Sequence, residues 1–232
     1  METKLAASEH IDLVIFDCDG VLIDSEVISA RMLVEELAKR QVHITMDYVA
    51  HHFLGRSYPI VLQQIREEFG VHLPPEFETE YRANLLAAFE NDLRAIPGVK
   101  DVIDTLACDY CLATSSSPPR LARSLEIAGL TEKFSGRTTT ASEVRHGKPA
   151  PDLFLLAAEK HGSDPANCLV IEDSENGIKA GLAAGMRVWR FTGGSHLKHL
   201  ANTPDAAAGA AQVFASFGEF YQLMPDLRRT GN

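Results

Sequence analysis

The sequence predicts an α/β fold, an open and doubly wound parallel sheet with a block of helices inserted after the first strand. The run Ile11–Phe16, apolar except at Asp12, ends abruptly at Asp17, which is typical of a buried strand in a parallel sheet. Residues 25–93 contain helical patterns and no convincing strand. From residue 94 onward strand and helix patterns alternate, which indicates βαβ units.

The inserted block begins with a helix after Asp24, where apolar and charged residues recur on opposite sides at helical spacing. The Gly55-Arg56 pair interrupts the pattern between the second and third helices, and Pro74-Pro75 precedes the fourth. We therefore predict two domains, a helical domain at 25–93 and an α/β domain made of 1–24 and 94–232. The later helices of the block are expected at Thr45–Leu54, Tyr58–Phe69 and from Pro74 to about Asp92.

The remaining α/β elements follow from apolar runs and from glycines that end helices. The predicted strands are Tyr110–Thr114, Cys168–Ile171 and Arg187–Phe191, and the predicted helices are Val99–Ala107, Pro118–Ala128, Ala150–His161 and Ile178–Ala184.

Composition narrows the class of partner. The chain has 232 residues and a formal net charge of −10, which argues against nucleic acid, because binding its phosphates needs a basic face. No segment has the uninterrupted apolar length of a membrane span, and residues 1–10 lack the apolar core of a secretory signal. The sequence thus predicts a cytoplasmic protein that acts on a small molecule.

The four cysteines do not suggest a disulfide framework. Cys18, Cys111 and Cys168 lie in or beside apolar runs, where a free cysteine behaves as a small buried apolar residue. Cys108 and Cys111 form a CxxC, but no second pair completes a zinc site in the sequence.

Acidic residues end two of the predicted strands. Asp17 and Asp19 follow the first strand, and Glu172 and Asp173 follow Cys168–Ile171. Neighbouring parallel strands would bring all four acids to one sheet edge, where an open α/β sheet binds its ligands. Such a group of hard oxygen atoms suits Mg²⁺. Taken singly, these acids are equally typical of solvated turns or helix starts.

The segment DCDGVLIDS, from Asp17 to Ser25, resembles the first motif of the haloacid dehalogenase-like phosphatases, DxDG(V/T)(L/I)xDS. The resemblance implies a Rossmann-like core and a small α-helical cap formed by 25–93. It also implies that Asp17 is the nucleophile and Asp19 the general acid/base. In the dehalogenase branch the position of Asp19 is not Asp, so its presence points to phosphate chemistry.

Three further segments resemble the later motifs of this superfamily. In CLATSSSPP, Thr114 matches the Ser/Thr of the second motif and Ser115 the adjacent phosphate contact, although Ser116 could shift this register by one. Lys148 in HGKPAPDLF matches the lysine that spans nucleophile and phosphate. In CLVIEDSENG the resemblance assigns Asp173 to the metal, with Asp17 and the carbonyl of Asp19 as further ligands and Glu172 in supporting reach.

The subgroup that fits best is similar to β-phosphoglucomutase and its relatives that act on small sugar phosphates. In the mutase a histidine stands where this chain has Ser29, and a lysine of the cap is used, whereas this chain has none between Lys39 and Lys100. These differences favour a phosphatase over the mutase alternative. We expect Arg56, Gly20 and Ser115 to bind the substrate.

The sequence therefore predicts a monomer that is a Mg²⁺-dependent phosphatase of a sugar phosphate or phosphogluconate-like metabolite, working through an aspartyl-phosphate. A non-enzymatic phospho-acceptor, such as a receiver domain, would lack both Asp19 and the insertion at 25–93. An inactive relative that senses a phosphorylated ligand is a third alternative, and the presence of every catalytic group argues against it. Five histidines are expected to be surface or core residues and not ligands, namely His51, His52, His146, His196 and His199.

Overall fold

A parallel sheet forms the core of the protein in a computed structural model, which describes residues 10–53, 58–198 and 209–229. Within these residues the sheet has six strands in the order β3-β2-β1-β4-β5-β6, and every neighbouring pair is parallel. The strands are β1 (Leu13–Phe16), β2 (Asp109–Thr114), β3 (Thr138–Thr140), β4 (Cys168–Glu172), β5 (Arg187–Phe191) and β6 (Gln212–Phe214). The predicted fold class is confirmed.

The strand order places β1 in the middle, with β2 on one side and β4 on the other. After β3 the chain crosses back past β1 to form β4, so the order reverses at β1, the position where doubly wound sheets bind ligands. Phe16 at the end of β1 is in register with Leu112 and Ile171. The residues that follow these strands therefore meet at one edge.

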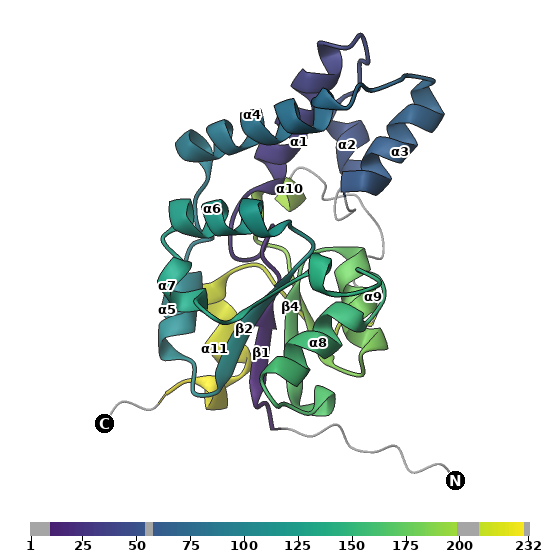
Figure 1. Cartoon of the computed structure of the whole chain (residues 1–232). Helices are drawn as coiled ribbons and strands as arrows, with labels where there is room; N and C mark the ends of the chain where they lie inside the picture. The colour runs from purple at the N-terminus through teal and green to yellow at the C-terminus, as the bar shows by residue number, and fades with distance from the viewer. Residues whose placement is uncertain (1–9, 54–57, 199–208, 230–232) are drawn as a thin grey trace.

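Helices cover both faces of the sheet (Figure 1). Alternate residues of β1 explain this, because Val14 and Phe16 pack in one cluster while Leu13 and Ile15 pack in another. The first cluster includes side chains of α5 (Val99–Thr105), α6 (Pro118–Ala128), α7 (Thr131–Phe134) and α11 (Phe220–Leu223), and the second those of α8 (Asp152–Lys160) and α9 (Glu175–Ala183).

A group of helices lies beyond the carboxyl ends of the strands (Figure 1). It comprises α1 (Glu26–Ala38), α2 (Met46–His52), α3 (Tyr58–Phe69) and α4 (Glu76–Asp92). Phe77, Tyr81, Leu85 and Phe89 recur every four residues along α4 and are buried, so one stripe of this helix packs inside the group. We call α1–α4 the helical segment.

Two adjacent connections join the helical segment to the sheet. Ile23 and Ala95 form an antiparallel bridge, the amide of Asp24 donates to the carbonyl of Arg94 (3.0 Å), and that of Ile96 donates to Leu22 (2.9 Å). The predicted domain boundaries at 24/25 and 93/94 fall at these connections, and the division into two domains stays a prediction.

The structure corrects several expected elements. Strands β3 and β6 and the short helices α7, α10 (Ser195–Lys198) and α11 were not anticipated. The two edge strands have three residues each, too short for a recognisable periodic pattern, and only pairing with β2 or β5 defines them. Helix α8 begins at Asp152 and not at Ala150, and α9 begins at Glu175, three residues before the expected Ile178.

Within the described ranges, no helix is both long enough and apolar enough to cross a lipid bilayer.

Candidate active site

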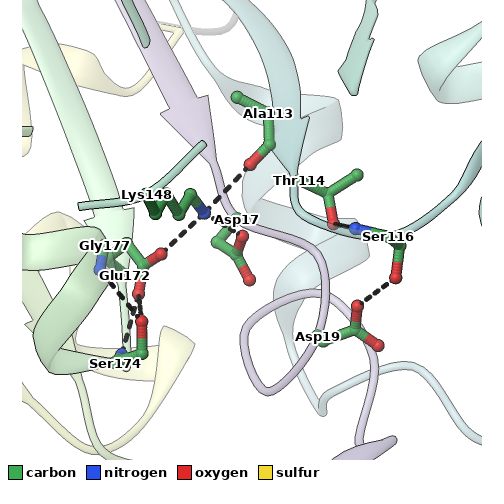
Figure 2. Close-up of polar contacts among 9 residues, drawn as sticks. All are labelled: Asp17, Asp19, Ala113, Thr114, Ser116, Lys148, Glu172, Ser174 and Gly177. Atoms are coloured by element: carbon green, nitrogen blue, oxygen red, sulfur yellow. Dashed lines mark hydrogen bonds and ion pairs between the residues drawn. The ribbon is translucent and has the colours of Figure 1, made fainter. Parts of the chain in front are cut away.

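The end of β1 brings Asp17 into contact with a buried lysine (Figure 2). The Nζ atom of Lys148, whose side chain is only 4% exposed, donates to Asp17 Oδ1, to Glu172 Oε1 (2.7 Å) and to the carbonyl of Ala113 (3.3 Å). Lys148 lies in the loop before α8, so the fold brings a residue 131 positions away in sequence onto Asp17. One cation is thus shared by two carboxylates from neighbouring strands.

Three acids form a buried cluster at this edge. Asp17, Glu172 and Asp173 each present an oxygen atom, and these oxygens all lie within 4.8 Å of one another. Three carboxylates so close together and out of water repel one another unless cations neutralise them, and Lys148 supplies one positive charge. The donor set consists of hard oxygen ligands, which fits Mg²⁺ and gives no reason to expect a soft metal.

Burial is the main reason that the pKa of Asp17 and that of Asp173 lie well above their ordinary value. For Asp17, the positive charge of Lys148 acts in the opposite direction, and the neighbouring acids raise the pKa further. For Asp173, the charge of Glu172 adds to the effect of burial. A divalent cation would reverse these shifts, because it favours the ionised carboxylates.

We expect the metal-free protein to lose stability as the pH rises. Since Asp17 and Asp173 have raised pKa values, the native state holds more protons than the unfolded chain above the ordinary value of 3.8, and the free energy of unfolding falls with pH in that window. Mg²⁺ should therefore raise the melting temperature more at about pH 8 than at about pH 5. Thermal unfolding with Mg²⁺ and with EDTA measures this difference, and equal shifts at both pH values would contradict it.

Asp19 lies apart from this cluster and is held by three donors (Figure 2 shows its contact with Ser116). Ser25 Oγ donates to its Oδ1 (2.5 Å), Ser116 Oγ to its Oδ2 (2.6 Å), and Arg120 Nη2 lies 2.7 Å from Oδ1. Burial by itself would raise the pKa of Asp19, but Arg120 and the two hydroxyls outweigh it and lower the pKa. Asp19 is therefore held as an ionised carboxylate.

Glu172 has a second set of partners that fixes its side chain. Its Oε2 accepts from the amide of Ser174 (2.8 Å) and from Ser174 Oγ (3.0 Å), and the same hydroxyl accepts from the amide of Gly177 (3.1 Å). Ser174, not Glu172 or Asp173, is thus the N-cap of α9. Glu172 at the end of β4 and Asp173 after it are therefore not the N-cap of α9, which was their alternative explanation.

In the turn after β2 the buried serine is Ser116 and not Ser115, the residue that was expected to contact phosphate. Thr114 is buried and its Oγ1 accepts from the amide of Ser116 (3.0 Å), whereas the side chain of Ser115 is exposed. Ser116 is buried and contacts Asp19. All three residues lie at the end of the strand next to β1 or directly after it, and their expected contacts with phosphate stay predictions.

The other two residues expected to bind substrate are Arg56 and Gly20. Arg56 lies outside the described residues. Gly20 has a φ of +80°, and a Cβ at this position would lie 2.0 Å from Asp173 Oδ2. A glycine is therefore required here so that the loop after β1 can approach Asp173.

Two residues near Asp19, Arg120 and Glu26, were not among the site residues predicted from the sequence. Arg120 extends from the first turns of α6 to Asp19, and its guanidinium lies over the ring of Phe89 of α4. Glu26, the first residue of α1, has its pKa raised to about 7 by burial and by the charge of Asp19. Their positions immediately after two of the motifs were the only sequence signal, because their contacts depend on how α1, α4 and α6 pack.

Removing Lys148 should destabilise the protein strongly. Lys148→Met leaves Asp17 and Glu172 buried without their shared cation, a change that typically costs about 3–5 kcal/mol. Urea unfolding at neutral pH measures this. Lys179→Met is the matched control, since its pair with Glu175 is exposed and should contribute less than about 1 kcal/mol. Equal losses in the two variants would contradict the prediction.

The fold is an open α/β sheet, and the site is a buried cluster of carboxylates at the ends of its central strands β1 and β4. The family model described as "haloacid dehalogenase-like hydrolase" matches residues 11–185. The chain therefore belongs to the haloacid dehalogenase-like hydrolases, and the recognition made from its motifs is confirmed.

Three similar proteins illustrate this membership. The 6-phosphogluconate phosphatase of Escherichia coli is 28% identical over 190 residues, which cover 82% of this chain and 86% of that protein. A haloacid dehalogenase-like protein of unknown function from Agrobacterium tumefaciens has a TM-score of 0.79 at 33% identity, with coverage of 93% and 98%. A hydrolase of the haloacid dehalogenase family from Deinococcus radiodurans, solved with bound phosphate and sodium, has a TM-score of 0.75 at 34% identity. The match covers 95% of this chain and 99% of that one.

Proposed function

We propose that this hydrolase is a Mg²⁺-dependent phosphatase that releases phosphate from a small phosphorylated metabolite through an aspartyl-phosphate on Asp17. The observation that carries the proposal is the buried group of Asp17, Lys148, Glu172 and Asp173 at the end of β1, with Asp19 two residues further on. Similarity to a 6-phosphogluconate phosphatase and to a structure with bound phosphate supports a phosphate monoester as substrate. A sugar phosphate or a phosphogluconate-like sugar acid is the substrate class we favour.

In the first step a carboxylate oxygen of Asp17 attacks phosphorus, and the bond from phosphorus to the leaving oxygen breaks. Asp19 gives a proton to that oxygen, so the metabolite leaves as an alcohol. In the second step Asp19 takes a proton from water, the water oxygen attacks phosphorus, and the bond from phosphorus to Asp17 breaks. Inorganic phosphate leaves and the carboxylate of Asp17 is regenerated. A covalent route replaces one very slow hydrolysis by two easier reactions.

The three donors around Asp19 fit the form that acts in the second step, because an ionised carboxylate is the one that accepts a proton. For the first step Asp19 must be protonated. Its contacts with Ser25, Ser116 or Arg120 therefore have to change when substrate enters.

The residues that would hold Mg²⁺ are Asp17, Asp173 and the main-chain carbonyl of Asp19, with Glu172 in reach. When bound, this ion supplies positive charge that keeps Asp17 ionised and offsets the charge of the phosphate. Lys148 contributes a further positive charge beside Asp17, and Thr114 and Ser115 are our candidates for phosphate contacts.

The helical segment, residues 25–93, is proposed as a cap that closes over this site and excludes water. Its connections at Asp24 and Arg94 lie side by side, as a hinge requires, and α4 contacts the core where Arg82 Nη1 donates to Ser117 Oγ (3.1 Å). Arg56 is our candidate residue in this cap for binding a second polar group of the substrate. A monomeric and cytoplasmic protein stays our expectation.

The test is Mg²⁺-dependent phosphate release from a panel of small phosphorylated sugars and sugar acids, with EDTA as the control. Sustained turnover that EDTA abolishes is the expected result. β-Glucose 1-phosphate belongs in the panel, because its isomerisation outpacing phosphate release would make the protein a mutase. The hydroxyl of Ser29 donates to the carbonyl of Ser25 (2.9 Å). A neutral hydroxyl cannot act as the base in that isomerisation. No turnover by the folded protein would favour the ligand-sensing alternative.

A further inference from the structure

A buried histidine contacts one of the acids of the candidate metal site. His196 Nε2 lies 3.0 Å from Asp173 Oδ2, and the His196 side chain is only 7% exposed. An Asp173 carboxylate that holds a cation is ionised and can only accept, so in that state Nε2 is the nitrogen that carries the hydrogen. The other ring nitrogen, Nδ1, is buried and has no hydrogen-bond partner among the described residues.

The position of His196 is fixed by a contact with the loop that follows β1. His196 belongs to α10, which comes after β5, and α10 packs against α1. The preceding residue, Ser195, donates from both its amide (3.0 Å) and its hydroxyl (2.8 Å) to Asp24 Oδ1. Two donors on one carboxylate oxygen anchor α10, so the imidazole has a defined place beside Asp173.

The loop at Gly20 approaches the same oxygen of Asp173. A Cβ on Gly20 would lie 2.0 Å from Asp173 Oδ2 and 2.9 Å from His196 Cε1, so both the Gly20 backbone and the imidazole lie close to this oxygen. In this orientation Asp173 presents an oxygen within 4.8 Å of oxygens of Asp17 and Glu172.

We propose that His196 is a positioning residue that orients the Asp173 carboxylate for a divalent cation, an inference that rests on the Mg²⁺ site of the proposed function. A histidine that donates to a carboxylate ligand sets the ligand in its binding orientation before the ion arrives. Loss of such an outer hydrogen bond typically weakens metal affinity about 10–100-fold. In this role His196 acts through its contact with Asp173.

The test is a calorimetric Mg²⁺ titration of the wild-type protein and of variants at His196. His196→Phe keeps the ring volume and removes the donor, so the dissociation constant for Mg²⁺ should rise about 10–100-fold. His196→Gln places an amide N–H near the position of Nε2 and should restore most of the affinity. His161→Phe is the matched control, because His161 is also largely buried and contacts an aspartate, Asp109 (2.7 Å), at the opposite end of the sheet.

Activity gives a second readout. The reduced kcat of His196→Phe at low Mg²⁺ should return toward the wild-type value when Mg²⁺ is raised well above the new dissociation constant, which general damage to the fold would not allow. If His196→Phe does not fold, His196→Ala and His196→Gln are compared in the same titration, with circular dichroism confirming the fold.

The outcomes separate this inference from the proposed function. Unchanged Mg²⁺ affinity in folded His196→Phe, with normal binding by the wild type, overturns the positioning role alone. Metal-independent turnover by a wild type that binds no Mg²⁺ overturns the inference and the metal requirement but leaves the phosphatase. A wild type that binds Mg²⁺ yet hydrolyses nothing overturns the proposed activity, while the affinity of the variants still decides the role of His196.

Discussion

Asp17→Asn is expected to abolish turnover while the protein remains folded. The amide cannot attack phosphorus as a carboxylate does, and removal of the nucleophile from a covalent mechanism typically lowers kcat by about four orders of magnitude or more. Folding should survive, because the substituted amide keeps the size of the side chain and Lys148 retains Glu172 as a partner. Phosphate release from the best substrate of the panel measures the loss.

The same variant tests where the covalent intermediate forms. Acid quenching of the wild type during turnover of a substrate labelled in its phosphate should trap label on the protein, and Asp17→Asn should trap none. Asp12→Asn is the control, since Asp12 precedes the amino end of the same strand and contacts Asn167, away from the site. Label that persists in Asp17→Asn would assign the nucleophile to another residue.

Asp19→Asn should have the second largest effect, and its size should depend on the leaving group. Loss of general acid catalysis typically lowers the rate about 10²–10⁴-fold, and a sugar alkoxide needs that proton in order to leave. Nitrophenolate leaves without a proton, so the first step with p-nitrophenyl phosphate should remain fast. The second step loses its base with either substrate.

This difference gives a distinctive time course. With p-nitrophenyl phosphate, Asp19→Asn should release a burst of about one equivalent of nitrophenolate per site and then turn over slowly, as expected when the covalent intermediate accumulates. With a sugar phosphate no burst should appear. Stopped-flow absorbance measures the burst, and equal rate losses on both substrates without a burst would remove Asp19 from the acid/base role.

Much of the central architecture could be predicted from local patterns. The run Leu13–Phe16 is apolar at every position, and such a strand can only be buried on both faces, which requires a parallel sheet covered by helices. The helix Pro118–Ala128 was predicted to the residue, because a proline at its start and Gly129 at its end mark both limits locally. Helices and inner strands were predictable because each has its own pattern of apolar residues in the local sequence.

The strands that were not predicted from the sequence depend on pairing with neighbouring strands. Thr138–Thr140 and Gln212–Phe214 are strands only because β2 and β5 offer them unpaired edges, and three residues hold no period to read. The same limit applies to the site. Motifs indicated Asp17, Asp19, Lys148, Glu172 and Asp173, and the structure brings all but Asp19 into one buried cluster through the strand order.

The sequence by itself determined the type of fold, the family and the acids after the strands, because each is encoded in a short run of residues. Only the tertiary structure decided what surrounds those acids. Arg120 reaches Asp19 from α6 and His196 reaches Asp173 from α10, and both contacts join segments far apart in the chain. Such contacts follow from the packing of whole helices against the sheet edge, and no local pattern of side chains specifies that packing.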